Sequence, residues 1–141
     1  MSGAKVDNIY LGTVAANGTG DDVQFVLRPV AGTPCDLGAA GAAGAVESSS
    51  VTWVSSSLNK AGLGNQAAGD SAAKDAYALL SSDYSENGNK SKNITIDNPV
   101  ATFSRANLIS KAGAMPFKIK LIAGKKPGAF ATSATYLVTY E

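Results

Sequence analysis

The last third of the chain carries the clearest pattern of hydrophobic and polar positions. From 116 to 122 lysines alternate with apolar side chains, and a second alternating run extends from 129 to 140. Successive side chains of a β-strand point to opposite faces, so both runs predict strands with one buried face. The intervening Lys125–Gly128 contains Pro and Gly and predicts a turn. We therefore expect these two strands to pair as a hairpin.

The final run divides its side chains between two faces. Tyr136, Val138 and Tyr140 share one parity, whereas Leu137 and Thr139 share the other. This pattern fits one buried and one partly exposed face. A register slip of one residue would turn the aromatic side chains to solvent. The strand reaches the penultimate residue, which suggests that the terminus itself is used.

Shorter runs earlier in the chain have the branched and aromatic side chains that favour strands. They predict strands at Val6–Val14, Val23–Arg28, Val51–Val54, Asn93–Ile96 and Val100–Phe103. Asn17-Gly18 predicts a tight turn, because both residue types tolerate the positive φ that such turns need. Ser71–Leu80 has a helix-like composition, but it is short and lies among strands, so we interpret it as a strand. About six or seven strands at this spacing are typical of an all-β sandwich.

Two polar or flexible segments are predicted to connect the strands. Leu37–Val46 is a Gly/Ala tract with little to bury, and we expect it to have no fixed structure. Asp83–Lys92 is rich in Asn, Ser and Lys and predicts a polar loop.

Composition excludes several classes of function. A length of 141 residues fits one domain, 1–141. The chain contains no histidine, which removes the commonest general base and the commonest metal ligand. Cys35 is the only cysteine, so no disulfide can form within the chain. We therefore expect no enzyme, no catalytic residues, no metal and no cofactor. A net charge of +1 gives no reason to expect nucleic acid as a partner.

Two candidate binding motifs are more simply structural. Gly62–Ala67 approaches the glycine pattern of dinucleotide-binding folds, but its third glycine is missing and no βαβ unit surrounds it. Trp53 and the five tyrosines are candidates for a ligand platform. Aromatic side chains at strand spacing belong more often to the core.

The C-terminal segment resembles that of the chaperone–usher pilins. Gly128 followed by alternating residues through Tyr140 is similar to the C-terminal signature of that family, and 115–120 resembles its penultimate strand. Earlier segments look like further strands of major pilins of the type 1 and type 3 kind, at 8–14, 23–27 and 51–58. The resemblance implies an immunoglobulin-like β-sandwich that lacks its seventh strand. It also implies a structural subunit of a bacterial fimbria or pilus that supports adhesion.

A missing strand implies partners that supply one. In this family a groove along an edge strand is filled by a periplasmic chaperone and then by the N-terminal extension of a neighbouring subunit. An outer-membrane usher and an extracellular fimbrium reached through the periplasm are implied with it. The resemblance assigns Gly128 to a bend or close approach and the terminal carboxylate of Glu141 to cationic side chains of the chaperone. The full set implied for the groove and the chaperone is Phe117, Ile119, Leu121, Gly128, Tyr136, Val138, Tyr140 and Glu141.

The N-terminal part departs from the family pattern. Family pilins carry a signal peptide, an N-terminal extension and a first strand with a cysteine, whereas no apolar segment follows Met1. Cys35 takes the place of the second family cysteine. We expect either an N-terminally truncated pilin or a natural variant that never had the disulfide. A homo-oligomer such as a swapped dimer, a monomer and a fibre all stay open.

Two hypotheses from other classes stand beside this one. The first is a carbohydrate-binding, adhesin-type sandwich, which would need a surface aromatic cluster with convergent polar groups. The second is a viral or phage surface protein with a similar sandwich, for which the absence of a signal peptide would be natural.

Overall fold

The computed structural model of the chain describes residues 9–27, 41–67, 69, 72–85, 90–110 and 113–141. Parts of several predictions lie outside these residues. They are the start of the first predicted strand, Arg28, Cys35, most of the Gly/Ala tract, Ser71 and positions 86–89 of the polar loop.

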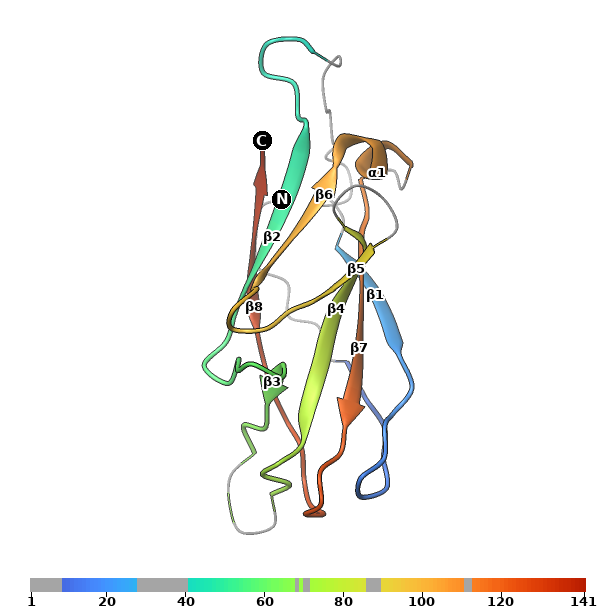
Figure 1. Cartoon of the computed structure of the whole chain (residues 1–141), viewed down its shortest axis with the longest axis vertical. Coiled ribbons are helices and arrows are strands. Elements are labelled where there is room, and N and C mark those ends of the chain that lie inside the picture. The colour runs from blue at the N-terminus through green and yellow to red at the C-terminus, as the bar shows by residue number, and fades with distance from the viewer. Residues whose placement is uncertain (1–8, 28–40, 68, 70–71, 86–89, 111–112) are drawn as a thin grey trace.

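The strands form two antiparallel sheets in an elongated molecule (Figure 1). The first sheet has the order β1 (Val23–Leu27), β7 (Met115–Ile122), β4 (Tyr77–Ser85) and β3 (Leu63–Gly64), with β5 (Lys90–Asn93) also paired to β4. The second has the order β6 (Val100–Ser104), β2 (Ser48–Val54) and β8 (Thr135–Tyr140). A short helix, α1 (Arg105–Ser110), follows β6. The prediction of an all-β sandwich is confirmed.

β7 is the central strand of the first sheet, and its alternation is complete. Its odd-numbered residues, including Phe117, are buried, whereas its even-numbered residues, including Lys118 and Lys120, are half-buried. Pro116 lacks an N–H, but the pairing of β7 with β4 ends at Phe117, so the proline breaks no bond of that ladder.

The core lies between the two sheets and is built around aromatic rings. Phe117 of β7 is fully buried. Its ring centroid lies 5.7 Å from that of Phe25 on β1, 5.3 Å from that of Trp53 on β2 and 5.7 Å from that of Phe103 on β6. Side chains from both sheets therefore meet in one cluster, as in sandwiches generally.

The predicted hairpin between the last two strands is wrong. β7 pairs with β1 on one edge and with β4 on the other, so its ladder is complete without β8. β8 crosses to the second sheet and pairs with β2. β7 was predicted correctly, and the second run was right only in its last part, Thr135–Tyr140. Adjacency in sequence does not reveal that both edges of β7 are occupied.

Other boundaries also differ from the predictions. Residues 9–14 form no strand, because Gly12 adopts a φ of 79° that interrupts an extended chain. In the predicted loop, β4 continues to Ser85 and β5 begins at Lys90, and the two strands pair with each other. In the strand predicted at 93–96, only Asn93 belongs to a strand.

The remaining local predictions are largely confirmed. Asn17 adopts a φ of 62° in the predicted turn, and β1 and β6 lie where expected. In the segment 72–80, Tyr77–Leu80 belong to β4. α1 was not predicted, although Ser104 provides a capping signal: its hydroxyl accepts a hydrogen bond from the Asn107 N–H at 3.3 Å.

Candidate functional site: the β8 edge

β8 is an edge strand among the described residues. It pairs with β2 on one side, in a register that places Tyr136 opposite Trp53 and Val138 opposite Val51. No described strand pairs with its other side. An unpaired strand edge exposes N–H and C=O groups that can bind another strand.

The register fixes which backbone groups occupy the open side. Ser48 and Glu141 exchange two hydrogen bonds, with N–O distances of 3.1 and 2.9 Å. In an antiparallel pair such doubly bonded positions alternate with unbonded ones. The backbone groups of Leu137 and Thr139 therefore face β2, and those of Tyr136 and Val138 face away from it.

The same alternation of inward and outward backbone groups continues in residues 129–133, which precede β8. The backbone groups of Ala129, Ala131 and Ser133 bond to the segment 55–73: Ala129 O accepts from the Ala73 N–H at 3.0 Å, and Ala131 O accepts from that of Gln66 at 2.6 Å. We define the β8 edge as the outward backbone groups of the intervening residues, Phe130, Thr132, Ala134, Tyr136 and Val138. The predicted strand 129–140 is thus one extended segment, although its ladder with β2 begins at Thr135.

The side chains along this segment follow the same alternation. Phe130, Ala134 and Val138 are half-buried and pack against the core. Tyr136 is 37% exposed, even though it shares their parity, and Leu137 on the opposite face is 65% exposed. The core-facing row is therefore incompletely covered at Tyr136, beside a strand edge that has no partner strand among the described residues.

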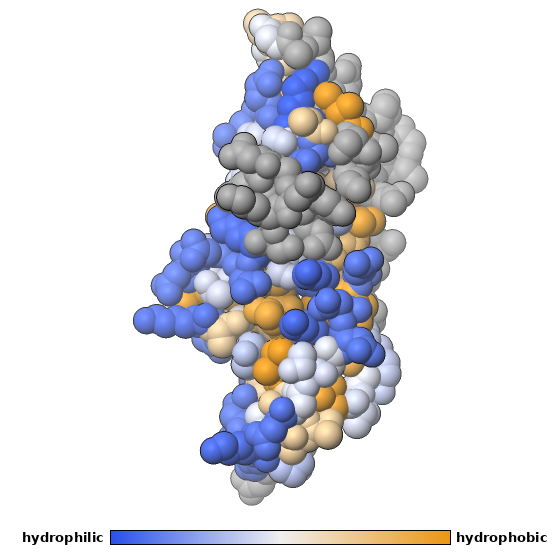
Figure 2. Space-filling view, turned by 45° about the vertical axis from the view of Figure 1, so that its right-hand side comes forward, coloured by the Kyte–Doolittle hydropathy of each residue, from blue (hydrophilic) through white to orange (hydrophobic). Residues whose placement is uncertain are grey.

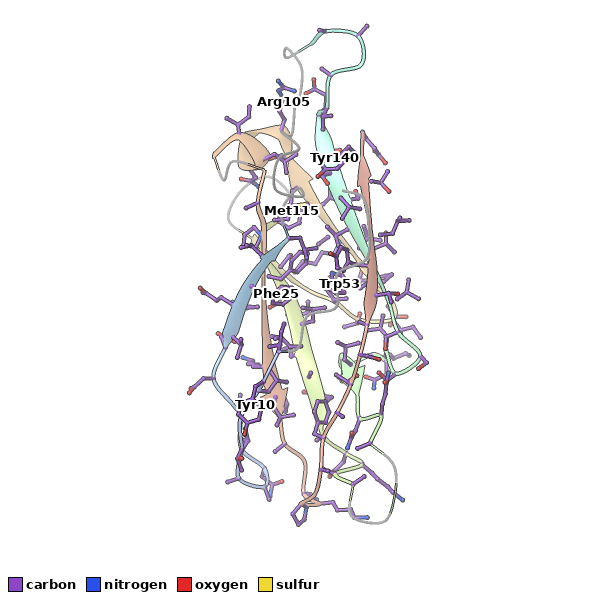
Figure 3. The ribbon with its side chains drawn as sticks, turned by 180° about the vertical axis from the view of Figure 1, so that it is seen from behind. Tyr10, Phe25, Trp53, Arg105, Met115 and Tyr140 are labelled. Carbon is purple, nitrogen blue, oxygen red and sulfur yellow. The ribbon has the colours of Figure 1, made fainter. Side chains whose placement is uncertain are left out.

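Trp53 connects the two outer strands of the sandwich. Its ring centroid lies 5.4 Å from that of Tyr136 on β8 and 6.2 Å from that of Phe25 on β1. Figure 3 shows Phe25 and Trp53 between the ribbons of β1 and β8. The indole Nε1 is buried and has no hydrogen-bond partner among the described residues. An aromatic layer thus lies directly behind the β8 edge.

The structure places the predicted groove residues on two opposite sheets. Phe117 contacts Trp53, Ile119 belongs to the same core cluster as Val138, and Leu121 belongs to a second cluster with Phe130. These β7 residues are buried and are not on a strand adjacent to β8. They form the opposite wall of the core behind the β8 edge.

The other predicted residues lie at the two ends of the final segment. Gly128 is exposed and has a φ of 150°, which residues with a side chain rarely adopt, in agreement with a bend. Glu141 is exposed, and its backbone oxygen accepts hydrogen bonds from the N–H groups of Glu47 and Ser48. Tyr140 lies opposite Ser49 and is half-buried.

Sequence reasoning missed three contributors to this site. Trp53 had been interpreted as a core residue, and Phe25 only as part of a predicted strand. Both contribute to the core, but their position behind an open edge depends on the crossing of β8 to the second sheet. Asn65 was considered only within the glycine-containing segment Gly62–Ala67. Its side-chain amide bonds to Ala129 O and Ala131 N, a long-range role that no local pattern reveals.

The described residues offer no other chemistry at this site. They contain no group of three or more His, Cys, Asp or Glu side chains placed to hold a metal ion. None of the helices in the described part is long and apolar enough to cross a membrane. On the face shown in Figure 2, apolar residues form separate patches among hydrophilic ones.

Comparisons with known proteins give two related sequences. The chain is 30% identical over 149 residues to the K99 fimbrial protein of Escherichia coli, and the match covers 99% of this chain and 76% of that protein. It is 30% identical over 142 residues to the F107 fimbrial protein of Escherichia coli, with 100% and 75% covered. No family model matches the sequence.

Proposed function

The chain belongs to the family of fimbrial proteins and is a structural subunit of a bacterial surface fimbria, and from this premise we propose that it assembles by accepting a β-strand at the β8 edge. Strand addition of this kind is a general mode of recognition, in which main-chain hydrogen bonds provide affinity and alternating side chains provide register. Fimbrial subunits assemble into a fibre, so the strand comes from a neighbouring subunit.

One observation carries this proposal. The two residues whose backbone groups point away from β2 carry their side chains on the core side: Val138 packs against the core, and the ring centroid of Tyr136 lies 5.4 Å from that of the buried Trp53. An incoming strand would therefore pair with the outward backbone groups of β8 and, at the same time, cover the exposed part of Tyr136. A strand arriving at an edge with exposed core-facing side chains gains hydrogen bonds and apolar burial in one step.

The chain's route to the fibre follows from the same edge. An unpaired edge beside half-covered apolar side chains is prone to aggregation. We propose that a periplasmic chaperone first lends a strand and that an outer-membrane usher presents the subunit for exchange. The exposed Glu141 carboxylate offers a site for cationic side chains of the chaperone.

The remaining assignments form part of the same proposal. Phe117, Ile119 and Leu121 support the incoming strand from behind, through the core, while Tyr136, Val138 and Tyr140 contact it. Gly128 provides the bend that starts the accepting segment. The chain acts as one immunoglobulin-like domain of a pilin of the type 1 and type 3 kind, and it has no enzymatic role.

A thermal melt tests strand acceptance. The chain is heated with and without a synthetic peptide that copies the N-terminal extension of a pilin. At about a hundredfold excess over Kd, a ligand of the folded state adds about 2.7 kcal/mol, which raises Tm by several degrees. The control is a peptide of identical composition with its alternation shifted by one residue, which presents the wrong side chains to the core. Equal melts with no peptide, the copied peptide and the shifted peptide would refute the proposal.

A further inference from the structure

The part of the edge that precedes β8, at residues 129–133, is held by side-chain bonds together with two backbone bonds. Residues 129–133 belong to no strand of the described sheets, and a single isolated bridge joins Ala129 to Ala72. In Figure 1 this part of the chain passes near β3, the short strand that precedes Asn65. A segment held extended without a strand partner needs another set of donors and acceptors.

Asn65 contributes both a donor and an acceptor to that set. Its Nδ2 donates to Ala129 O at 2.8 Å and to Ala73 O at 2.9 Å. Its Oδ1 accepts from the Ala131 N–H at 3.0 Å and from the Ala67 N–H at 2.8 Å. An amide has two donors and two acceptor lone pairs, so this side chain is fully used.

Gln66 and its neighbours continue the attachment toward β8. The Gln66 N–H donates to Ala131 O at 2.6 Å, and its Oε1 accepts from the Ser133 hydroxyl at 3.0 Å. Ser55 donates its hydroxyl to Ser133 O at 2.6 Å. All these bonds go to odd-numbered residues of the segment. In β8 it is likewise the odd-numbered residues whose backbone groups face β2.

We propose that Asn65, assisted by Gln66, is a positioning residue for strand acceptance and substitutes for a neighbouring strand along 129–133. This inference rests on the proposed function. Asn65 turns the backbone groups of odd residues inward and thereby presents those of Phe130, Thr132 and Ala134 to the incoming strand. The incoming strand then pairs along the whole edge, about twice the length that β8 alone offers.

The substitution that tests this role is Asn65→Asp. It keeps the size of the side chain but replaces the two N–H donors with a carboxylate oxygen that faces Ala73 O and Ala129 O, which is repulsive. Asn59→Asp is the matched control, because Asn59 Oδ1 only accepts from the nearby N–H groups of Ala61 and Gly62. Gln66→Ala is a milder second variant in case Asn65→Asp does not fold.

The measurement compares three peptides on each variant. One copies a pilin extension of about eleven residues, enough to span the edge, and the other two each retain about six residues from one of its ends. The short peptide that pairs with β8 is the one that protects the Tyr136 and Val138 amides of the wild type from hydrogen exchange.

The inference predicts a selective loss. Asn65→Asp should lower the affinity for the long peptide about tenfold or more, as the loss of one or two hydrogen bonds implies. It should leave the affinity for the short peptide that pairs with β8 unchanged. Gln66→Ala should show a smaller selective loss, and Asn59→Asp none. Exchange of the Ala73 amide, whose N–H donates to Ala129 O, should accelerate in Asn65→Asp, because the carboxylate repels Ala129 O while it still accepts from the Ala131 N–H.

Three outcomes would overturn the inference. If Asn65→Asp lowered the affinity for the long and the short peptides equally, Asn65 would have only a general structural role. Unchanged binding of both would show no role. A wild type that bound no peptide would refute strand acceptance itself, a failure distinct from the first two.

Discussion

Trp53 and Tyr136 lie directly opposite each other across β2 and β8, with their ring centroids 5.4 Å apart, yet they differ greatly in exposure. Trp53 is 7% exposed and Tyr136 is 37% exposed. Both side chains face the core, so the difference reflects their place in the sheet: β2 has a neighbour on each side, and β8 has a described neighbour on one side only. The exposed part of Tyr136 is therefore the surface that an added strand would cover.

The first prediction compares two neighbouring residues of β8. Tyr136→Ser should weaken capture of the pilin peptide about tenfold or more, because it removes apolar surface that the added strand would bury. Leu137→Ser is the matched control and should have little effect, since Leu137 faces away from the core. Peptide titration followed by isothermal calorimetry measures both. If both variants lost the same affinity for the peptide, or if Leu137→Ser lost more, the added strand would not cover the face of β8 that carries Tyr136.

The second prediction concerns the buried indole of Trp53. Its Nε1 has no hydrogen-bond partner in the part of the chain that the structure describes, and a buried unsatisfied donor costs about 1–3 kcal/mol. Trp53→Phe removes this donor while keeping a ring, so we expect the free energy of unfolding to change by only about 1 kcal/mol. Trp53→Ala should cost about 3–5 kcal/mol. Urea unfolding distinguishes them, and a Phe variant as unstable as the Ala variant would show that packing alone decides.

The third prediction concerns pH. The Asp75 carboxylate accepts hydrogen bonds from the N–H groups of Lys125, at 2.7 Å, and Lys126, at 3.3 Å, in the connection between β7 and β8. The Lys125 N–H in particular lowers the pKa of Asp75 below its ordinary value. A lowered folded-state pKa stabilises the fold above the unfolded pKa of about 3.9, and this contribution is lost as pH falls through the folded value.

Melts of the wild type and Asp75→Asn across pH test this. The wild type should have the higher Tm at neutral pH, and the gap should narrow below about pH 4. A gap that stayed constant down to about pH 2 would show that the Asp75 charge contributes nothing.

The fourth prediction concerns Gly124, which packs against the same carboxylate. A Cβ at this position would clash with the carboxyl group of Asp75, so Gly124→Ala must displace the Asp75 side chain from the Lys125 N–H. We expect Gly124→Ala to destabilise the wild type more than it destabilises Asp75→Ala. Urea unfolding of the four proteins gives the coupling free energy. A value of zero would show that the two sites act independently.

The sequence predicted the strands better than their partners. Alternation correctly identified β7 and the buried row that includes Phe117, and parity correctly placed Tyr136 and Val138 toward the core. Pairing depends on which edges are already occupied, and that is a property of the whole sheet. For this reason the hairpin prediction was wrong, although β7 and the last part of the second run were right.

The support for the accepting edge was also beyond the reach of local patterns. Asn65 contacts Ala129, a residue far along the chain, and an asparagine beside glycine predicts only a turn. In the segment 129–134, by contrast, the alternation correctly predicted an extended chain. What it did not predict is that bonds from Asn65 and its neighbours, and not a paired strand, hold this segment.

Amide hydrogen exchange at β8 tests strand acceptance most directly. In the chain alone, the amides of Tyr136 and Val138 should exchange quickly, whereas those of Leu137 and Thr139, which face β2, should be protected. Adding the pilin peptide should protect Tyr136 and Val138 and leave the other two unchanged. If all four amides are protected without peptide, or if the peptide protects none of them, β8 does not accept a strand from another molecule.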